Sequence, residues 1–187
     1  MLCGIFVGGK ASRMGGLAKG LLPAPEGGEP LVVRLARLAT ELGLEPVLVG
    51  SDARYAEALP ALRAVPDQPP GIGPLGGLSG LLEAAQDGPV IALACDLPRV
   101  SRGLLAKLAS HPSRAAVLAP RGQGGFWEPL CARYDATLVR APLAAAIARG
   151  VRSFKQLFEM LPVEALELSD AERAELGDWD TPEDLQR

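Results

Sequence analysis

Short apolar segments alternate with amphipathic helical segments along most of this chain. The clearest apolar segments, at 2–7, 46–49 and 89–94, are four to six residues long. That length suits a strand buried on both faces and is too short for a helix. Residues 30–42 place leucines at helical spacing on one side and charged residues on the other. Because parallel strands need a crossover, the alternation predicts a mostly parallel sheet with helices on both faces.

Weaker patterns add further elements of both kinds. Ser101 can cap a helix that follows the strand at 89–94. Further strands are expected at 63–65, 115–118, 126–132 and 163–168, and further helices at 55–62, 75–85, 135–149 with a restart at Pro142, and 151–161. Since 187 residues can bury a sizeable core, we predict an α/β fold: a single three-layer α/β/α domain with a Rossmann-like sheet.

Composition and charge argue against several classes of function. The net charge is −3, whereas a general nucleic-acid binder usually carries a basic excess. Cys3, Cys95 and Cys131 match neither a disulfide framework nor a zinc spacing. The single histidine, His111, argues against a Ser-His-Asp or Cys-His mechanism. No apolar run reaches membrane-spanning length and no leader is visible, so we expect a cytoplasmic protein with no nucleic-acid partner and no membrane partner.

A glycine-rich segment follows the first strand. Gly8 and Gly9 let the backbone approach a ligand with its N–H groups outward, and Arg13 and Lys19 add positive charge. Such donors suit a polyphosphate, although a flexible turn is the plain alternative. The spacing fits neither a Walker P-loop nor a dinucleotide fingerprint, because Lys19 is not preceded by glycine and the first glycines are adjacent.

Aspartates follow three of the expected strands. Asp52 comes after 46–49, Asp67 after 63–65, and Asp96 directly after 89–94. In a parallel sheet, ligands bind over the carboxyl ends of the strands. The glycine-rich segment and these aspartates are therefore expected to converge on one site.

These segments together resemble the molybdenum cofactor guanylyltransferases, within the wider group of NTP:phosphate nucleotidyltransferases. The resemblance spans almost the whole chain and keeps the family order. It is carried by 8–22, Asp67, Gly-Pro-Leu-Gly-Gly-Leu at 73–78, Cys-Asp-Leu-Pro at 95–98, Glu-Pro-Leu at 128–130 and Asp-Thr-Pro-Glu-Asp at 180–184.

The resemblance implies a nucleotidyltransferase-type topology and a reaction. GMP would pass from GTP to the terminal phosphate of Mo-molybdopterin with release of pyrophosphate, and Mg²⁺ would be the cofactor. Residues 1–100 would form the NTP-binding half and 101–187 the acceptor-binding half, with acceptor contacts on 121–127 and in the last third. Docking to other molybdenum-cofactor proteins is a further expected partnership.

The resemblance also assigns roles to single residues. Arg13 would neutralise the leaving pyrophosphate, Lys19 would lie near the reacting phosphates, and Asp96 would hold Mg²⁺. These three form the expected catalytic set, and Asp180 is a second expected metal contact. Because the attacking phosphate is already an anion, no general base is needed. The implied nucleotide-binding residues are Phe6, Val7, Gly8, Gly9, Arg13, Lys19, Asp52, Asp67, Gly73, Leu75 and Asp96.

Each assignment has a plain structural alternative. Asp96 could cap the next turn, Asp67 could belong to an ordinary proline and glycine turn, and Asp180 could cap the last helix. Lys19 could be a solvated surface lysine. These readings stay open at the level of the sequence.

The chain also departs from the family pattern. Val7 replaces the usual alanine, Ala18 replaces the usual aspartate before Lys19, and Asp178 and Asp180 replace asparagines. These changes concern the substrate more than the type of reaction. Three alternatives follow: the sister cytidylyltransferase of the same cofactor, a nucleotidyltransferase for another small phosphate, and a non-catalytic nucleotide-binding protein.

Overall fold

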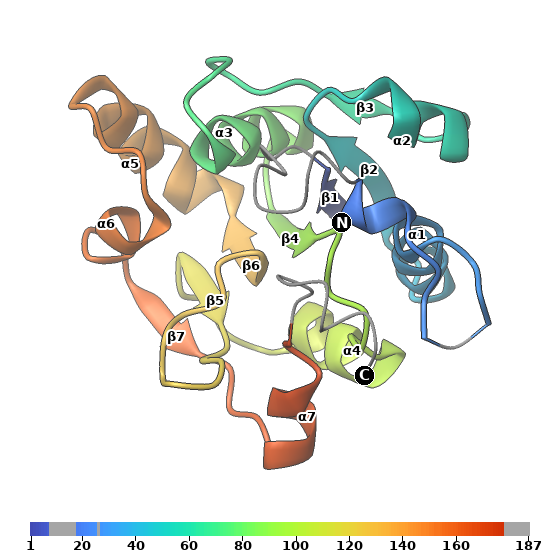
Figure 1. The fold of residues 1–187 in the computed structure, drawn as a ribbon. Coiled ribbons are helices and arrows are strands. Elements are labelled where there is room, and N and C mark those ends of the chain that lie inside the picture. The colour runs from blue at the N-terminus through green and yellow to red at the C-terminus, as the bar shows by residue number, and fades with distance from the viewer. Residues whose placement is uncertain (8–17, 26, 178–187) are drawn as a thin grey trace.

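A seven-stranded sheet runs through the centre of the molecule (Figure 1). The computed structural model describes residues 1–7, 18–25 and 27–177. Its strands are β1 (Leu2–Phe6), β2 (Glu45–Val49), β3 (Ala64–Val65), β4 (Pro89–Ala94), β5 (Val117–Ala119), β6 (Cys131–Asp135) and β7 (Val163–Ala165). Its helices are α1 (Leu31–Glu41), α2 (Ala53–Ala58), α3 (Pro74–Ala85), α4 (Arg102–Ser110), α5 (Ala136–Ala148), α6 (Phe154–Phe158) and α7 (Asp170–Ala174), with a short 3-10 helix η2 (Lys19–Leu21).

The strand order is β3-β2-β1-β4-β6-β5-β7. Every pairing is parallel except the two made by β6, which runs antiparallel to β4 and β5. The mostly parallel sheet predicted from the sequence is therefore confirmed. Phe6 pairs with Val49 on one side and Ala94 on the other, so the carboxyl ends of β1 to β4 lie along one edge. We call this the carboxyl edge. Because β6 is reversed, Cys131 at its start pairs with Leu93 and the chain enters β6 at the same edge.

Helices cover both faces of the sheet. The leucines of α1 and α4 pack with Ile5 and Leu93 on one face. Helices α3, α5 and α6 pack with Phe6 and Ala92 on the other, as the arrangement in Figure 1 shows. The predicted three-layer α/β/α class is confirmed. Among the described residues, none of the helices combines the length and the apolar character that crossing a bilayer requires.

The expected strand at 126–132 is wrong in its bounds. Residues 121–127 form a hairpin loop closed by an isolated bridge between Arg121 and Trp127. A turn follows, in which the N–H of Cys131 donates to the carbonyl of Glu128 at 3.1 Å. Pro129 has no N–H to offer a neighbouring strand, so the ladder begins only at Cys131. The other expected strands are present, with bounds that differ by at most three residues.

Three helices also differ from their expected ranges. Helix α2 ends before Pro60, and α5 continues through Pro142 without the expected restart. The apolar face of α5 packs on the sheet, which outweighs the one hydrogen bond that the proline removes. Helix α6 covers only five residues, because the Ser153 side chain caps its start by accepting from the N–H of Gln156.

Candidate functional site

Three aspartates lie at the carboxyl edge, each just beyond the end of a strand. Asp52 follows β2, Asp67 follows β3 and Asp96 follows β4. The N–H of Cys95 donates to the carbonyl of Phe6 at 3.3 Å, so the sheet continues past its last paired residues. The structure thus places at one edge the carboxylates that the sequence spreads over 45 positions.

Lys19 meets Asp96 at this edge. Its Nζ lies 3.3 Å from Oδ2 of the carboxylate, although the two residues are 77 positions apart in the chain. Their side chains are only 16 % and 24 % exposed, so the pair is shielded from water on most sides. Asp96 therefore supplies the acidic neighbour that Lys19 lacks at position 18. The ion pair joins the end of the glycine-rich segment to the end of β4.

Tyr55 fixes the turn that carries Lys19. The buried Tyr55 hydroxyl accepts a hydrogen bond from the N–H of Gly20 at 3.2 Å and contacts Sγ of Cys95 at 3.7 Å. A Cβ on Gly20 would lie 2.8 Å from the tyrosine ring and 2.9 Å from Cβ of Cys95. Only glycine fits this close approach. The N–H of Gly20 and the side chain of Lys19 are therefore held against α2 and the end of β4.

Burial keeps both partners of this contact protonated. It is the main cause that raises the pKa of Tyr55 above its usual range. It also raises the pKa of the Cys95 thiol to about 11, with the charge of Asp96 as the second cause. Neither group is an effective base or nucleophile at neutral pH. Sequence reasoning missed Tyr55, because a tyrosine in a short helix is equally typical of an ordinary core.

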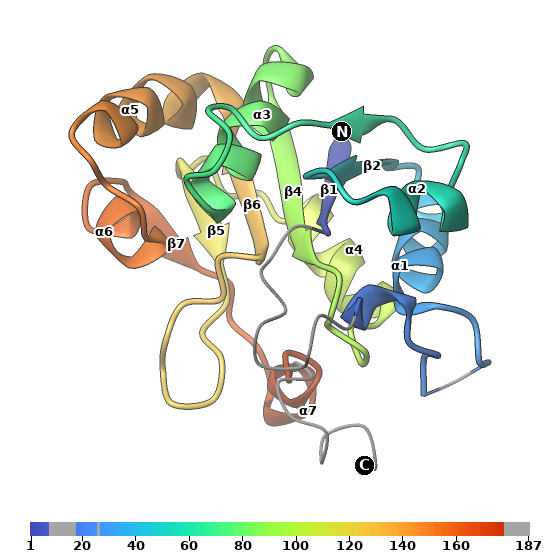
Figure 2. The same cartoon turned by 45° about the horizontal axis from the view of Figure 1, so that its top comes forward.

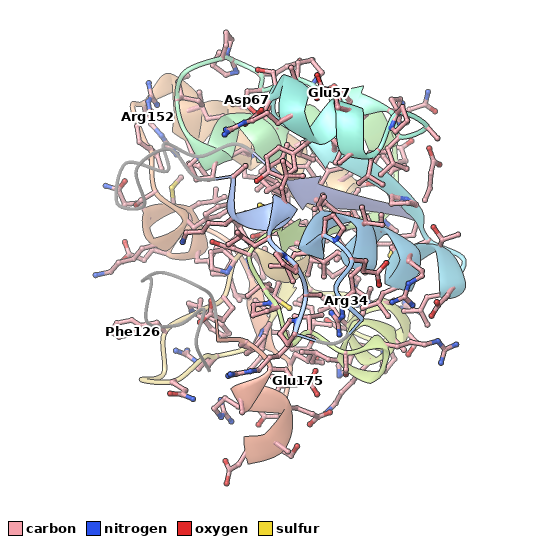
Figure 3. All side chains as sticks on the ribbon, turned by 45° about the vertical axis from the view of Figure 1, so that its right-hand side comes forward. Arg34, Glu57, Asp67, Phe126, Arg152 and Glu175 are labelled. Atoms are coloured by element: carbon pink, nitrogen blue, oxygen red, sulfur yellow. The ribbon has the colours of Figure 1, made fainter. Side chains whose placement is uncertain are left out.

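Asp67 lies against the first turns of α3. A Cβ on Gly77 would lie 3.3 Å from Oδ1 of Asp67 and 2.9 Å from the ring of Phe6, so these three residues form one wall. In Figure 3, Asp67 is labelled to the left of α2, near α3. Burial raises the pKa of its carboxyl. A partly desolvated carboxylate of this kind favours a ligand that brings N–H donors.

Asp52 has a local role in the structure. Its Oδ1 accepts from the N–H of Arg54 at 3.0 Å and caps α2, and its Oδ2 pairs with the Arg54 guanidinium at 2.7 Å. The hydrogen bond from that side chain lowers the pKa of Asp52. Beside it lies a cavity of about 260 Å³ at the ends of β1 to β3, lined by Val7, Gly50 and Pro66 among others. Asp52 borders this cavity with a carboxylate that Arg54 already binds.

The other expected site residues are placed differently. Phe6 and Val7 are buried at the end of β1, and Leu75 is fully buried, so only backbone groups of Leu75 remain for a ligand. Gly73 precedes α3 with a φ of 78°, a left-handed conformation that favours glycine. Four expected residues, Gly8, Gly9, Arg13 and Asp180, lie outside the described residues.

The donor set at the carboxyl edge suits a magnesium ion that is shared with a substrate. Within the part of the chain that the structure describes, no three His, Cys, Asp or Glu residues cluster as a self-sufficient metal site. Mg²⁺ usually keeps several waters and binds through one or two carboxylates together with substrate phosphates. Asp96 is a hard oxygen ligand in that position, so the residues present fit such an ion.

Comparison with known sequences gives one family. Residues 3–163 match the family model described as "MobA-like NTP transferase domain". A molybdenum cofactor guanylyltransferase of Pseudomonas putida is 36 % identical over 190 residues, which cover 97 % of this chain and 94 % of that protein. A probable molybdenum cofactor guanylyltransferase of Chloroflexus aggregans is 32 % identical over 194 residues, which cover 100 % and 92 %.

Solved structures give the same fold. Molybdopterin-guanine dinucleotide biosynthesis protein A from Archaeoglobus fulgidus matches with a TM-score of 0.80 at 24 % identity, over 100 % of this chain and 95 % of that chain. A nucleotidyl transferase from Methanothermobacter matches with a TM-score of 0.75 at 20 % identity, over 98 % and 93 %. The expected nucleotidyltransferase-type topology is thereby confirmed.

Proposed function

This chain belongs to the MobA-like NTP transferase family, and from that premise we propose that it transfers GMP from GTP to the terminal phosphate of Mo-molybdopterin. It is an enzyme, a nucleotidyltransferase with a role in molybdenum cofactor biosynthesis. In the proposed reaction Mg²⁺ is the cofactor, molybdopterin guanine dinucleotide is formed and pyrophosphate is released. The nucleotide, the metal and the acceptor are the part that is proposed.

The pair formed by Lys19 and Asp96 is the observation that carries the proposal. One positive and one negative side chain lie 3.3 Å apart and mostly shielded from water, where the glycine-rich segment meets the end of β4. Transfer between two phosphates must bring two anions together, so a fixed cation lowers the barrier. Lys19 supplies that cation at the reacting phosphorus.

No side chain at this edge has to remove a proton. The acceptor phosphate is already an anion, so positioning and charge neutralisation suffice. The one histidine of the chain, His111, caps the end of α4 and accepts from the N–H of Ser113. It precedes β5, whose first residue pairs with Tyr134 near the end of β6, and so lies at the opposite edge of the sheet.

Asp96 is the protein ligand for Mg²⁺ in this proposal. When bound, the ion would supply positive charge that offsets the negative charge of the reacting phosphates. The Asp96 carboxylate would hold the ion, and the Lys19 ammonium beside it would contact a phosphate oxygen of the nucleotide. Arg13 and Asp180, which lie outside the described residues, keep their expected roles at the pyrophosphate and the metal.

The base is proposed to lie on the side of β1 to β3. Guanine carries N–H donors at N1 and N2, and the partly buried carboxylate of Asp67 can accept from both. The cavity of about 260 Å³ beside Val7 and Pro66 adds apolar walls at the same strand ends. Among the described residues, Asp67 is thus the one that would favour GTP over the other nucleoside triphosphates.

Thermal unfolding with GTP, CTP or ATP, each with Mg²⁺, tests the nucleotide. At a hundredfold excess over Kd, we expect GTP to raise Tm by about 5 °C or more, because ligand binding then adds about 2.7 kcal/mol to the folded state. CTP and ATP are expected to stabilise less, and chelation of Mg²⁺ should reduce the effect of GTP. Pyrophosphate release in the presence of Mo-molybdopterin tests the reaction.

Each contrary result removes a defined part of the proposal. If CTP stabilises the protein more than GTP does, the base in the reaction is cytosine, and the proposed class of reaction is unchanged. If chelation of Mg²⁺ leaves turnover unchanged, the reaction does not need the metal and that part of the proposal fails. If GTP binds but no pyrophosphate is released with Mo-molybdopterin, the acceptor assignment fails.

A further inference from the structure

An aromatic pocket lies on the other side of β4 from the proposed base site. Its volume is about 300 Å³, and residues of the hairpin loop at 121–127 and of the α6 segment line it. Figure 2 shows this loop and α6 on the side of β5 to β7. The chain has four phenylalanines and two tryptophans. Three of those phenylalanines, Phe126, Phe154 and Phe158, and the tryptophan Trp127 line this one pocket.

The pocket has a fixed back wall and an exposed front. Trp127 packs edge-to-face on Phe158 with 6.1 Å between ring centroids, and Phe158 packs in the same way on the fully buried Tyr134 at 6.2 Å. Phe126 is 78 % exposed and projects from the hairpin loop in Figure 3. An aromatic side chain that served only the core would not stand in water while its neighbours line an open pocket.

Charged groups at the pocket are of both signs. The Arg121 guanidinium stacks on the Trp127 ring at 3.8 Å and donates to the carbonyl of Gly125 at 2.7 Å, so its position is fixed. Lys155 and Glu159 of the α6 segment also line the pocket. A carboxylate beside aromatic faces can accept from the ring N–H groups of a flat heterocycle, and the two cations suit its anionic substituents.

The pocket borders the proposed site of transfer. Pro129 lines it, and the next residue, Leu130, accepts from the N–H of Ala94 through its carbonyl at 2.7 Å. Asp96 lies two residues beyond Ala94. The end of β4 that leads to Asp96 is therefore hydrogen-bonded to the segment that forms one wall of the pocket.

We propose that this pocket binds the pterin ring system of the acceptor, with the ring against Trp127 and Phe126 and its phosphate arm directed to Asp96. The assignment rests on the proposed function for the identity of the acceptor. Stacking supplies affinity, Glu159 recognises ring N–H donors, and Arg121 and Lys155 face the anionic dithiolene part. The nucleotide occupies the side of β1 to β3, so the two substrates approach the reacting phosphates from opposite sides of β4.

Titration with 6-carboxypterin, a soluble oxidised pterin, tests the pocket directly. We expect Trp127→Ala to weaken pterin binding about tenfold and Phe126→Ala several-fold, because each removes a stacking face. GTP affinity should stay unchanged in both. Leu138→Ala is the matched control, since Leu138 is an exposed apolar residue of α5 that does not line the pocket.

A polar variant separates recognition from apolar adsorption. Glu159→Gln should weaken the pterin but leave the affinity for 8-anilinonaphthalene-1-sulfonate, a flat anion without ring N–H donors, unchanged. Should Trp127→Ala fail to fold, as its melting curve would show, the exposed Phe126→Ala still decides the question. Equal pterin affinity in the wild type and Phe126→Ala would then overturn the proposal, as would a dimer that Phe126→Ala converts to a monomer with no change in pterin affinity.

The outcome is distinguishable from failure of the proposed function. If pterin binds here but the wild type transfers no GMP, the function falls and the pocket assignment stands. If GMP is transferred but neither variant changes the KM for Mo-molybdopterin, the pocket assignment falls and the function stands.

Discussion

The ends of β2 and β4 look alike in the sequence and differ in the structure. Each strand is a short apolar run followed within three residues by an aspartate. At the end of β2, Asp52 binds Arg54 two positions away and caps a helix. At the end of β4, Asp96 binds Lys19, which lies 77 positions away. The same local pattern therefore gives a local cap in one place and a long-range site in the other.

The difference lies in how each carboxylate is satisfied. Asp52 has an N–H and a guanidinium from its own turn, with half of the Arg54 side chain exposed. The partner of Asp96 comes from the glycine-rich segment and is mostly shielded from water. A locally satisfied carboxylate contributes to folding, whereas one held by a distant cation is positioned for exchange with a ligand. Substitutions at both strand ends should therefore have different effects on activity and on stability.

The largest effect is expected from Asp96→Ala. Loss of the metal ligand should lower kcat by about 1,000-fold or more, equivalent to about 4 kcal/mol, because charge neutralisation by the metal is worth several kcal/mol. The measurement is pyrophosphate release with GTP, Mg²⁺ and Mo-molybdopterin. Asp87→Ala is the control, since Asp87 is a largely exposed carboxylate before β4, at the opposite edge. Near-wild-type turnover in folded Asp96→Ala would remove Asp96 from the metal site.

Asp67→Asn is expected to have the second-largest effect. It changes a desolvated carboxylate that does not cap a helix. GTP affinity should fall about tenfold, since a charged hydrogen bond worth about 1.5 kcal/mol or more is weakened. Burial raises the pKa of Asp67, so its ionised form opposes folding. The stability of the wild type should therefore fall as the pH rises through that raised pKa.

The same variant also tests the stability of the fold. An asparagine side chain cannot ionise, so Asp67→Asn should be more stable than the wild type at pH 8. This gain should vanish near pH 4, below which the unfolded carboxyl is also protonated. Calorimetry at both pH values, with GTP titration at pH 8, gives both quantities. Unchanged GTP affinity together with a gain in stability would show that Asp67 destabilises the fold without binding GTP.

Tyr55→Phe tests whether the position of Lys19 depends on the hydrogen bond between the Tyr55 hydroxyl and the N–H of Gly20. The variant leaves the N–H of Gly20 without its hydroxyl partner, which should cost about 1 kcal/mol of stability and lower kcat about fivefold as Lys19 loosens. Tyr134→Phe is the matched control, since it also loses a buried hydroxyl bond, to the carbonyl of Pro129 at 2.7 Å. Both variants should lose stability, whereas the fall in kcat should appear only in Tyr55→Phe. Equal effects in both variants would mean that Tyr55 serves the fold alone.

Features that depend on a local sequence pattern could be predicted, whereas features that depend on a contact between distant segments could not. The apolar runs of β1 and β4, and the aspartate after β4, were recognisable because burial and strand ends leave a direct pattern. The contact of Tyr55 with Gly20 was not, since it joins segments 35 positions apart through a hydroxyl. The start of β6 was misplaced because aromatic residues at 126–127 have strand propensity, yet they belong to the hairpin loop at the aromatic pocket.

Asp52→Ala is expected to have the smallest effect and to complete the contrast with Asp96. Loss of the cap should lower stability by about 1 kcal/mol, or about 2–4 °C in Tm, whereas the exposed ion pair with Arg54 adds little. Because Arg54 lowers the pKa of Asp52, its ionised form stabilises the fold above the unfolded pKa, and this share is lost as the pH falls below about 4. Asp52→Asn keeps the cap and should lose less, with the difference from the wild type shrinking in acid. Melting curves of both variants and KM for GTP are the measurements. A KM that rises in Asp52→Asn with no loss of stability would show that Asp52, which borders the cavity proposed for the base, contacts the nucleotide, and the two strand ends would then share one function.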